Sequence, residues 1–335
     1  MYLDLAKELE DATGIFSRPK CVCKRAQVFH ICMAPGGYAI AIQKMQKRLD
    51  TFGITLPESE GGHKLLVQKS KRQPMTSVEL DVTMLGSEFG LDWNAVSATN
   101  AFINRLVTSR PFEKNRFDIV VCDGNIVSED KVNWSIEKYA RETMRLEYSQ
   151  LILAMQRIKP QGTIAMLMRN VEDIRTIHML HDLVKFSLVQ TFKPVSHHQN
   201  RGTFYMVAKE VDPVHPAAIE ALRRWKREWA AVTVPESIPG TPHCLIAKPA
   251  EMQKVITNFG ARLLELGAQP WSVQLAGIES IMAKYGRASL SCEGDGEIKD
   301  SNYEEKHIFR VWKGANNTSR ALIEDDFVLG AKKSR

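Results

Sequence analysis

The sequence predicts an α/β protein with a doubly wound, mostly parallel sheet, followed by a helical C-terminal extension. Three observations support this fold class. Short apolar segments alternate with longer amphipathic ones between residue 27 and about residue 212. The segment FDIVVC at 117–122 is apolar and rich in β-branched residues, as expected of a parallel strand that is buried on both faces. After about residue 212 only helical patterns remain.

The elements follow from these patterns in order. An acidic amphipathic helix is expected in the first sixteen residues, and a turn at Pro35–Gly37 separates the first strand from the helix YAIAIQKMQKRL. The expected strands are 27–34, 51–57, 64–68, 77–80, 117–122, 163–168, 187–193 and 203–208, and further helices are expected at 137–158 and 172–186. The last two strands form a hairpin-like pair, which would add an antiparallel strand to the sheet.

The remainder of the chain is expected to be helical at 216–231, 249–266 and 270–284, with an acidic flexible linker at 291–306. The apolar helix face formed by Val255, Phe259, Leu263 and Leu266 must be buried against something. We therefore divide the chain into an N-terminal helical segment, a central α/β domain, a helical extension and a flexible tail, at 1–26, 27–212, 213–288 and 289–335.

Composition sets limits on the function. The 335 residues are 44% hydrophobic and 25% charged, which fits one globular domain with an appendage or two small domains. The net charge of +6 permits a nucleic-acid partner without requiring one. No signal-peptide pattern and no run of eighteen apolar residues occurs, so we expect no membrane span and a cytoplasmic or nuclear location.

The six cysteines form no CxxC pair and no metal-ligand spacing, so we expect no metal. Cys32 and Cys122 lie within apolar segments. We interpret them as small buried hydrophobic residues in a reducing compartment.

Polar residues follow three of the predicted strands, at His30–Gly37, Leu80–Asp81 and Cys122–Gly124. Ligands of open α/β sheets bind at the carboxyl ends of the strands. Glycines in the turn Ala34–Gly37 would let a ligand approach the backbone, and the free N–H groups of the next helix suit a carboxylate. Asp81 could accept a hydrogen bond from an adenine amino group. Each aspartate could instead cap a helix or form a turn; we favour a functional role for both Asp123 and Asp81.

Four segments, which occur in the same order as in the family, resemble the motifs of FtsJ-like methyltransferases. PKCVCKRAQVFHICMAPGGY resembles the family's first motif, an apolar strand with an acidic residue followed by APGG, and FDIVVCDGN resembles the fourth. YSQLILAMQRIKPQGTIAMLM resembles the helix–KPGG–strand segment, and TFKPVSHHQNRGTFYMVAKE resembles the closing strands. The phrases FGITLPESEGGHKLL, DVTMLGSEFG and PWSVQLAGIESI further resemble a fungal branch of the family whose substrate is unassigned.

This resemblance implies a Rossmann-like seven-stranded fold, S-adenosylmethionine (AdoMet) as the cofactor, and RNA or a small molecule as the methyl acceptor. It implies that Asp123 lies where the methyl donor and the acceptor meet. The cofactor-binding positions that it implies are His30, Ala34, Pro35, Gly36, Gly37, Tyr38, Thr55, Asp81, Val82 and Asp123.

The chain departs from the family's Lys-Asp-Lys-Glu tetrad for ribose 2′-O methylation. Asp123 matches the Asp, but Leu167 occupies the position of the second Lys and Thr203 that of the Glu; Lys20 and Lys24 are candidates for the first Lys. A ribose hydroxyl is a very weak acid, so it needs a positioned base or a lysine with a lowered pKa, and leucine provides neither. Methyl transfer itself depends mainly on in-line positioning, so a more acidic acceptor could still react.

The cofactor positions also differ. His30 replaces the acidic residue of the first motif and Thr55 the acidic residue at the end of the second strand, for which Glu58 could substitute. Possible replacement polar groups near the acceptor are His30, Arg169, His197 and His198. We consider an active methyltransferase first and a catalytically inactive module that binds RNA or a protein second. A nicotinamide enzyme is disfavoured because no GxGxxG follows the first strand.

The densest basic segment is Arg223–Trp229. Arginine and tryptophan together can bind nucleic acid. Trp225 and Trp229 lie four residues apart and therefore on one helix face. We favour the structural interpretation, in which both tryptophans pack on the sheet.

Overall fold

The computed structural model describes residues 2–16, 25–46, 48–67, 73–96, 100, 102, 104–126, 134–234 and 249–289. The chain divides into two compact units, Met1–Ser280 and Ile281–Arg335, and the sheet belongs to the first. The predicted linker at 291–306, the tail, and Lys20 and Lys24 lie outside the described residues. None of the helices in the described ranges is both long and apolar enough to cross a membrane.

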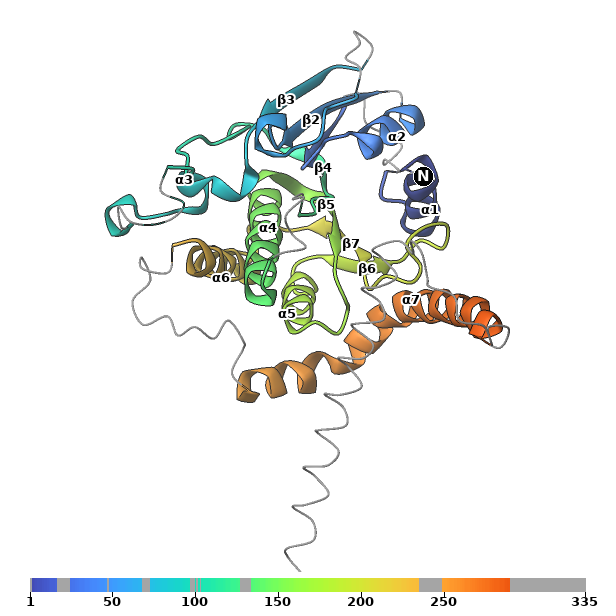
Figure 1. Ribbon diagram of the computed structural model, residues 1–335. Coiled ribbons are helices and arrows are strands. Elements are labelled where there is room, and N and C mark those ends of the chain that lie inside the picture. Colours follow the sequence, from blue (N-terminus) through green and yellow to red (C-terminus); the bar gives the residue numbers. More distant parts are fainter. Residues whose placement is uncertain are drawn as a thin grey trace, which may run out of the picture. The chain divides into compact units, whose positions relative to one another are not determined.

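The first unit is built on a seven-stranded sheet with the order β3-β2-β1-β4-β5-β7-β6 (Figure 1). Neighbouring strands are parallel except for β7, which is antiparallel to both β5 and β6. The carboxyl ends of β1 to β6 therefore lie along one edge, and the predicted doubly wound fold is confirmed. The strands are β1 (Ala26–Ile31), β2 (Leu49–Thr55), β3 (Met75–Glu79), β4 (Phe117–Cys122), β5 (Ile158–Met168), β6 (Leu188–Phe192) and β7 (Phe204–Val211).

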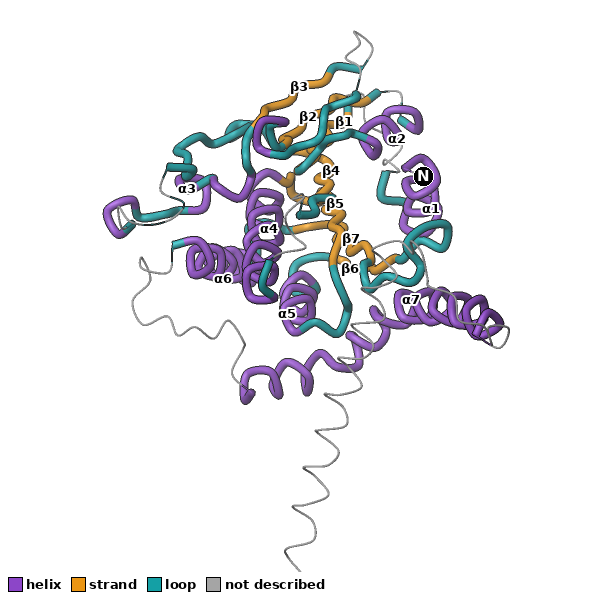
Figure 2. The backbone as a smooth tube through the Cα atoms, in the orientation of Figure 1, coloured by secondary structure: helices purple, strands orange, loops and turns teal. Residues whose placement is uncertain are grey.

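Helices cover both faces of the sheet (Figure 2). The helices α1 (Tyr2–Thr13) and α2 (Gly37–Met45) lie on one face, and α4 (Ile136–Arg157), α5 (Ile174–Leu183) and α6 (Pro216–Thr233) lie on the other. The connections after β2 and β3 carry the short helices η1 (Glu58–Glu60), η2 (Val82–Met84), α3 (Gly86–Phe89) and η3 (Trp93–Ala95). The last described helix is α7 (Pro249–Ser289).

Two predicted elements are wrong. The segment predicted as a strand at 64–68 has no strand in its described part, 64–67. This segment stabilises the turn after β1 instead. The Leu66 backbone N–H donates to the Pro35 carbonyl at 3.0 Å, and the Val67 side chain packs on Gly36. The two helices predicted on either side of Pro270 are one helix. Proline can remain within a helix when packing on both sides supports it, and here Leu266 and Trp271 both contact the main core.

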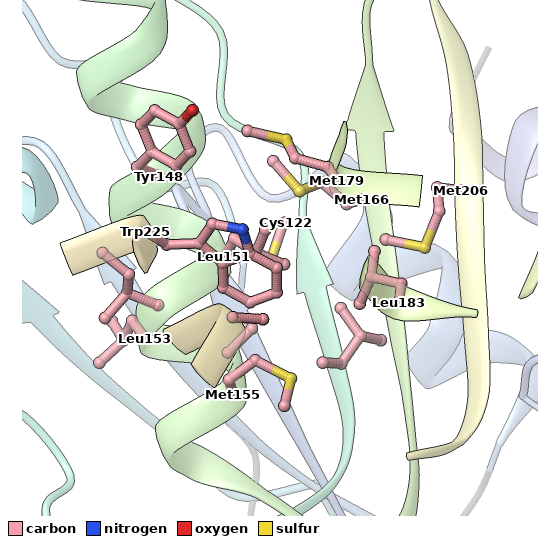
Figure 3. Close-up of a cluster of buried hydrophobic side chains, with 14 of the residues drawn as sticks. Cys122, Tyr148, Leu151, Leu153, Met155, Met166, Met179, Leu183, Met206 and Trp225 are labelled. Atoms are coloured by element: carbon pink, nitrogen blue, oxygen red, sulfur yellow. The ribbon is translucent and has the colours of Figure 1, made fainter. Parts of the chain in front are cut away.

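The main core lies between the sheet and α4, α5 and α6. Figure 3 shows Leu151 of α4 and Trp225 of α6 meeting Cys122 and Met166 of the strands. Full burial of an apolar side chain such as Leu151 contributes about 1.5–3 kcal/mol. On the other face, Leu5 and Leu9 of α1 and other apolar residues of α1 and α2 pack on the sheet in a second cluster.

The extension packs against the α/β core rather than standing apart. Trp225 and Trp229 are fully buried, which confirms the structural interpretation of the basic segment. Arg223 and Arg227 are exposed and lie 3.7 and 3.8 Å from Glu220. The Trp229 indole N–H donates to the Thr83 carbonyl at 3.0 Å, so α6 supports the turn that follows β3.

Helix α7 lies along the edge strand β6. Its predicted apolar face, Val255, Phe259, Leu263 and Leu266, is buried in the main core. The side-chain amide of Gln269 accepts from the Lys193 N–H at 2.8 Å and donates to the Lys193 carbonyl at 2.9 Å, as a neighbouring strand would. These contacts satisfy backbone groups that an uncovered sheet edge would present to other chains.

Candidate functional site

A cavity of about 480 Å³ opens at the carboxyl ends of β1, β2 and β3. It is lined by Cys32 and Ala34 after β1, Thr55 at the end of β2, and Asp81 and Val82 after β3. This volume falls within the range of about 300–1,000 Å³ that is usual for small-molecule sites. Its place is the one that the alternation of strands and helices predicts.

The first turns of α4 form the opposite wall. Trp134 precedes the helix, and Lys138, Glu142 and Leu146 follow at intervals of four residues, so all four face the cavity. The Lys138 ammonium lies 4.4 Å from the centre of the Trp134 ring. This wall therefore combines charged, aromatic and apolar side chains.

Asp81 both caps a helix and lines the cavity. One carboxylate oxygen accepts from the Thr83 N–H at 2.9 Å and from the Thr83 hydroxyl at 2.7 Å. The other accepts from the Arg105 guanidinium at 2.7 Å, and Arg105 also lies 3.9 Å from Glu60. Glu60, Asp81 and Arg105 additionally line a second cavity of about 710 Å³. The structural and functional interpretations of Asp81 are therefore compatible.

The glycine turn after β1 differs from expectation. Gly36 has φ 98°, in the left-handed region that favours glycine, and a Cβ there would lie 2.1 Å from Val67. A Cβ on Gly37 would lie 2.1 Å from the ring of Tyr2. The space that both glycines leave is filled by the chain's own side chains, so the turn serves packing and places Ala34 at the cavity.

Asp123 follows β4 beside a cluster of three tyrosines. Its carboxylate accepts from the Tyr205 hydroxyl at 3.2 Å. The Tyr205 ring lies edge to face with Tyr38 at 5.8 Å, and Tyr38 lies edge to face with Tyr2 at 5.6 Å. We call Tyr2, Tyr38 and Tyr205 the tyrosine cluster. Burial raises the pKa of Asp123 from 3.8 to about 7, although the Tyr205 hydrogen bond opposes the shift.

Cys32 connects the cavity with Asp123. Burial and the negative charges of Asp81 and Asp123 raise the pKa of the Cys32 thiol to about 12. Its φ of 65° is uncommon for a residue other than glycine and is typical of functional sites. Cys122 is fully buried as predicted, whereas Cys32 is half-buried and lines the cavity.

Nine of the ten predicted cofactor residues fall into three groups, and His30 lies apart from them. Ala34, Thr55, Asp81 and Val82 line the cavity. Tyr38 and Asp123 lie in or beside the tyrosine cluster, and Pro35, Gly36 and Gly37 form the packed turn. His30 is not among the cavity residues: it is 3% exposed within β1, and burial lowers its pKa to about 4, so it is neutral near pH 7.

The two substituted tetrad positions, Leu167 and Thr203, carry no charge. Leu167 faces Tyr205 across the β5–β7 pair and packs against the apolar cluster that contains Tyr38. The Thr203 carbonyl accepts from the Lys193 ammonium at 2.6 Å, and burial lowers the pKa of Lys193 to about 8. Within the part of the chain that the structure describes, no lysine or arginine forms an ion pair with Asp123.

Two of the suggested replacement groups, Arg169 and His197, have partners other than Asp123. Arg169 donates to the Tyr139 hydroxyl at 3.0 Å and lies 3.4 Å from Glu147, and His197 lies 3.8 Å from Asp4. Sequence reasoning also missed Glu60, which lines the cavity where Glu58 does not. No sequence signal distinguishes these two glutamates, because both belong to the same short helix η1.

The doubly wound sheet and the cavity at its carboxyl edge define an α/β protein with a space of small-molecule size where open sheets of this kind bind their ligands. The model of the FtsJ-like methyltransferase family matches residues 7–211, which is more than half of the chain. The chain therefore belongs to this family.

Three solved structures illustrate the similarity. A putative ribosomal RNA methyltransferase from Plasmodium falciparum is 16% identical, with a TM-score of 0.42 over 63% of this chain and 97% of that one. Human methyltransferase-like protein 13, in complex with S-adenosylhomocysteine (SAH), is 11% identical, with a TM-score of 0.34 over 75% and 96%. An rRNA methylase from Streptococcus thermophilus is 8% identical, with a TM-score of 0.36 over 61% and 97%. No curated protein matches the chain.

Proposed function

We propose that this protein is an AdoMet-dependent methyltransferase and that the cavity at the ends of β1, β2 and β3 binds the cofactor. The observation that carries the proposal is the position of Thr55, Asp81 and Val82 around one cavity in a member of the FtsJ-like family. Asp123, whose charge acts on the cavity residue Cys32, would then face the methyl acceptor.

The residues present fit the cofactor. Ile54, Leu80 and Val82 provide apolar surface for an adenine ring, and Asp81 and Glu60 provide carboxylate oxygens for its amino group and for ribose hydroxyls. AdoMet supplies a methyl group already activated on a sulfonium, so the chain's own task is to bind and orient it. RNA and a small molecule are the two acceptor classes that the sequence leaves open. The fungal branch rests on the sequence phrases alone and stays a prediction.

Calorimetric titration with AdoMet and SAH tests the proposal. Asp81→Ala and Asp92→Ala form a matched pair, because each aspartate caps a short helix and accepts from the backbone N–H two residues later, at 2.9 and 3.0 Å. Each variant loses about 1 kcal/mol of capping, but only Asp81 lines the cavity.

We expect micromolar binding by the wild type, at least about tenfold weaker binding by Asp81→Ala and unchanged binding by Asp92→Ala. A wild type that binds neither AdoMet nor SAH would overturn the proposal. Equal losses of AdoMet and SAH affinity in the two variants would show that loss of the helix cap, and not the position of Asp81 in the cavity, weakens binding.

The second candidate is a catalytically inactive module that binds RNA or a protein partner. Leu167 and Thr203 favour it, since neither can act as a base or a charged donor, and so does the packing of Tyr2 on Gly37. It predicts that Asp123→Ala leaves the function in cells intact, whereas the methyltransferase proposal predicts that the variant loses it.

A further inference from the structure

Among the residues that the structure describes, none gives the Asp123 carboxylate a compensating positive charge. It is partly buried, its hydrogen-bond donor is the Tyr205 hydroxyl, and it has no ion pair with a described lysine or arginine. A buried carboxylate without a cation is costly, and groups perturbed in this way are concentrated at functional sites. The missing charge can come from a ligand.

The surroundings of Asp123 suit a cation. The rings of Tyr205, Tyr38 and Tyr2 follow one another at edge-to-face distances of 5.8 and 5.6 Å, and Leu167 packs against the same cluster. Aromatic faces attract ammonium groups, and the attraction increases when water is excluded. A carboxylate beside several tyrosines therefore favours a positively charged group over a neutral one.

We propose that the methyl acceptor of this protein is an amine, which the Asp123 carboxylate and the tyrosine cluster recognise as its ammonium form. The inference rests on the proposed methyltransferase function and specifies the acceptor class at the same site. It contrasts with the ribose hydroxyl that the family resemblance implies.

The chemistry distinguishes the two acceptors. A hydroxyl must give up its proton as the new bond forms, and the alkoxide character that develops needs a cation, which the described residues do not place at Asp123. An amine has a free lone pair once it is deprotonated, and its methylated product is an ammonium ion. That product charge is stabilised by the rings and, once Asp123 has released its proton, by the carboxylate.

The step is balanced as follows. The ammonium passes one proton to the Asp123 carboxylate. The nitrogen lone pair then forms a bond to the methyl carbon, while the carbon–sulfur bond breaks and its electron pair goes to sulfur. The products are the methylated ammonium and SAH, and Asp123 afterwards releases its proton to water.

Binding of two small probes to the SAH-saturated protein tests the inference. The probes are n-butylammonium and 1-butanol, which share a carbon chain and differ in the amine or hydroxyl group. Saturation-transfer NMR measures both affinities in the wild type, in Asp123→Asn and in Tyr2→Leu. Asp92→Asn is the control, because Asp92 is an exposed carboxylate that does not line the cavity.

We expect the wild type and Asp92→Asn to prefer n-butylammonium by at least about tenfold, and Asp123→Asn to lose that preference. Asparagine keeps the shape of the side chain and an acceptor for Tyr205, so folding should be preserved, which SAH binding and thermal unfolding verify. Tyr2→Leu should weaken amine binding by about threefold or more and leave 1-butanol unaffected.

The outcomes separate the two claims. If the wild type does not bind SAH, the proposed function fails and the amine inference fails with it. If SAH binds but the two probes bind equally, or if Asp123→Asn keeps the preference for the amine, only the amine inference is overturned.

Discussion

The Asp123 carboxylate should destabilise the folded protein at neutral and alkaline pH. Burial raises its pKa from 3.8 to about 7. Because the pKa is higher in the folded state than in the unfolded state, the folded state takes up a proton in this interval and stability falls as the pH rises through it. A shift of about 3 units at about 1.4 kcal/mol per unit gives an upper limit of ~4 kcal/mol, which partial exposure lowers to about 2–3 kcal/mol.

Asp123→Asn removes the charge and keeps an acceptor for the Tyr205 hydroxyl. We expect it to raise the free energy of unfolding by about 2–3 kcal/mol near pH 8 but by only about 0.5 kcal/mol near pH 4, where the aspartate is protonated in the folded protein. Urea unfolding followed by tryptophan fluorescence at both pH values measures the difference, with Asp92→Asn as control. An equal gain at both pH values, or a loss near pH 8, would refute the reasoning.

Three further predictions concern the cavity and its supports. Glu60→Gln should weaken SAH binding in calorimetry by about tenfold to a hundredfold, because a hydrogen bond to a charged group contributes about 1.5–3 kcal/mol. Glu58→Gln is the control: it lies in the same short helix but outside the cavity, so the SAH affinity should not change. Glu88→Ala should lower the free energy of unfolding by about 3–5 kcal/mol, since it leaves Arg157, 2.6 Å away, charged and buried. Adding Arg157→Met should recover part of the loss, and strictly additive losses in a double-mutant cycle would contradict this account. Gln269→Ala should cost about 1–2 kcal/mol and speed hydrogen exchange along β6 without altering SAH affinity; unchanged exchange would show that α7 does not protect the edge.

The centre of the sheet could be predicted because strands such as β1, β4 and β7 are largely buried on both faces. FDIVVC has apolar side chains on both sides and became β4 with the predicted bounds. The apolar residues of 64–67 also indicated a strand, but the structure has no strand there. Val67 fills the space above Gly36, while Leu66 is 60% exposed, so apolar composition alone did not distinguish a strand from the packing of a turn.

The position of the site could be predicted better than its contacts. Ala34, Thr55 and Asp81 each lie at or after the end of a predicted strand. Because the carboxyl ends of parallel strands lie at the same edge of a sheet, the sequence predicted that these residues are close together, as they are around the cavity. The contact of Tyr2 with Gly37 joins the start of α1 to the start of α2, and that of Tyr205 with Asp123 joins residues 82 apart in sequence. Local periodicity contains no information about such pairs, since they depend on how α1 docks on the sheet and on the register of β5 with β7.

The departures from the tetrad and the tyrosine cluster have a common consequence. Leu167 packs against the cluster and Thr203 engages Lys193 through its backbone, so neither supplies a charge to Asp123. An asparagine could fill the same space and accept the same hydrogen bond, without the cost of burying a charge. A carboxylate that packing does not require, and that we expect to lower stability near neutral pH, fits the proposed cationic ligand. If Asp123→Asn both stabilises the protein near pH 8 and loses the preference for n-butylammonium, one substitution will have shown that the cost in stability and the recognition of an amine have the same origin.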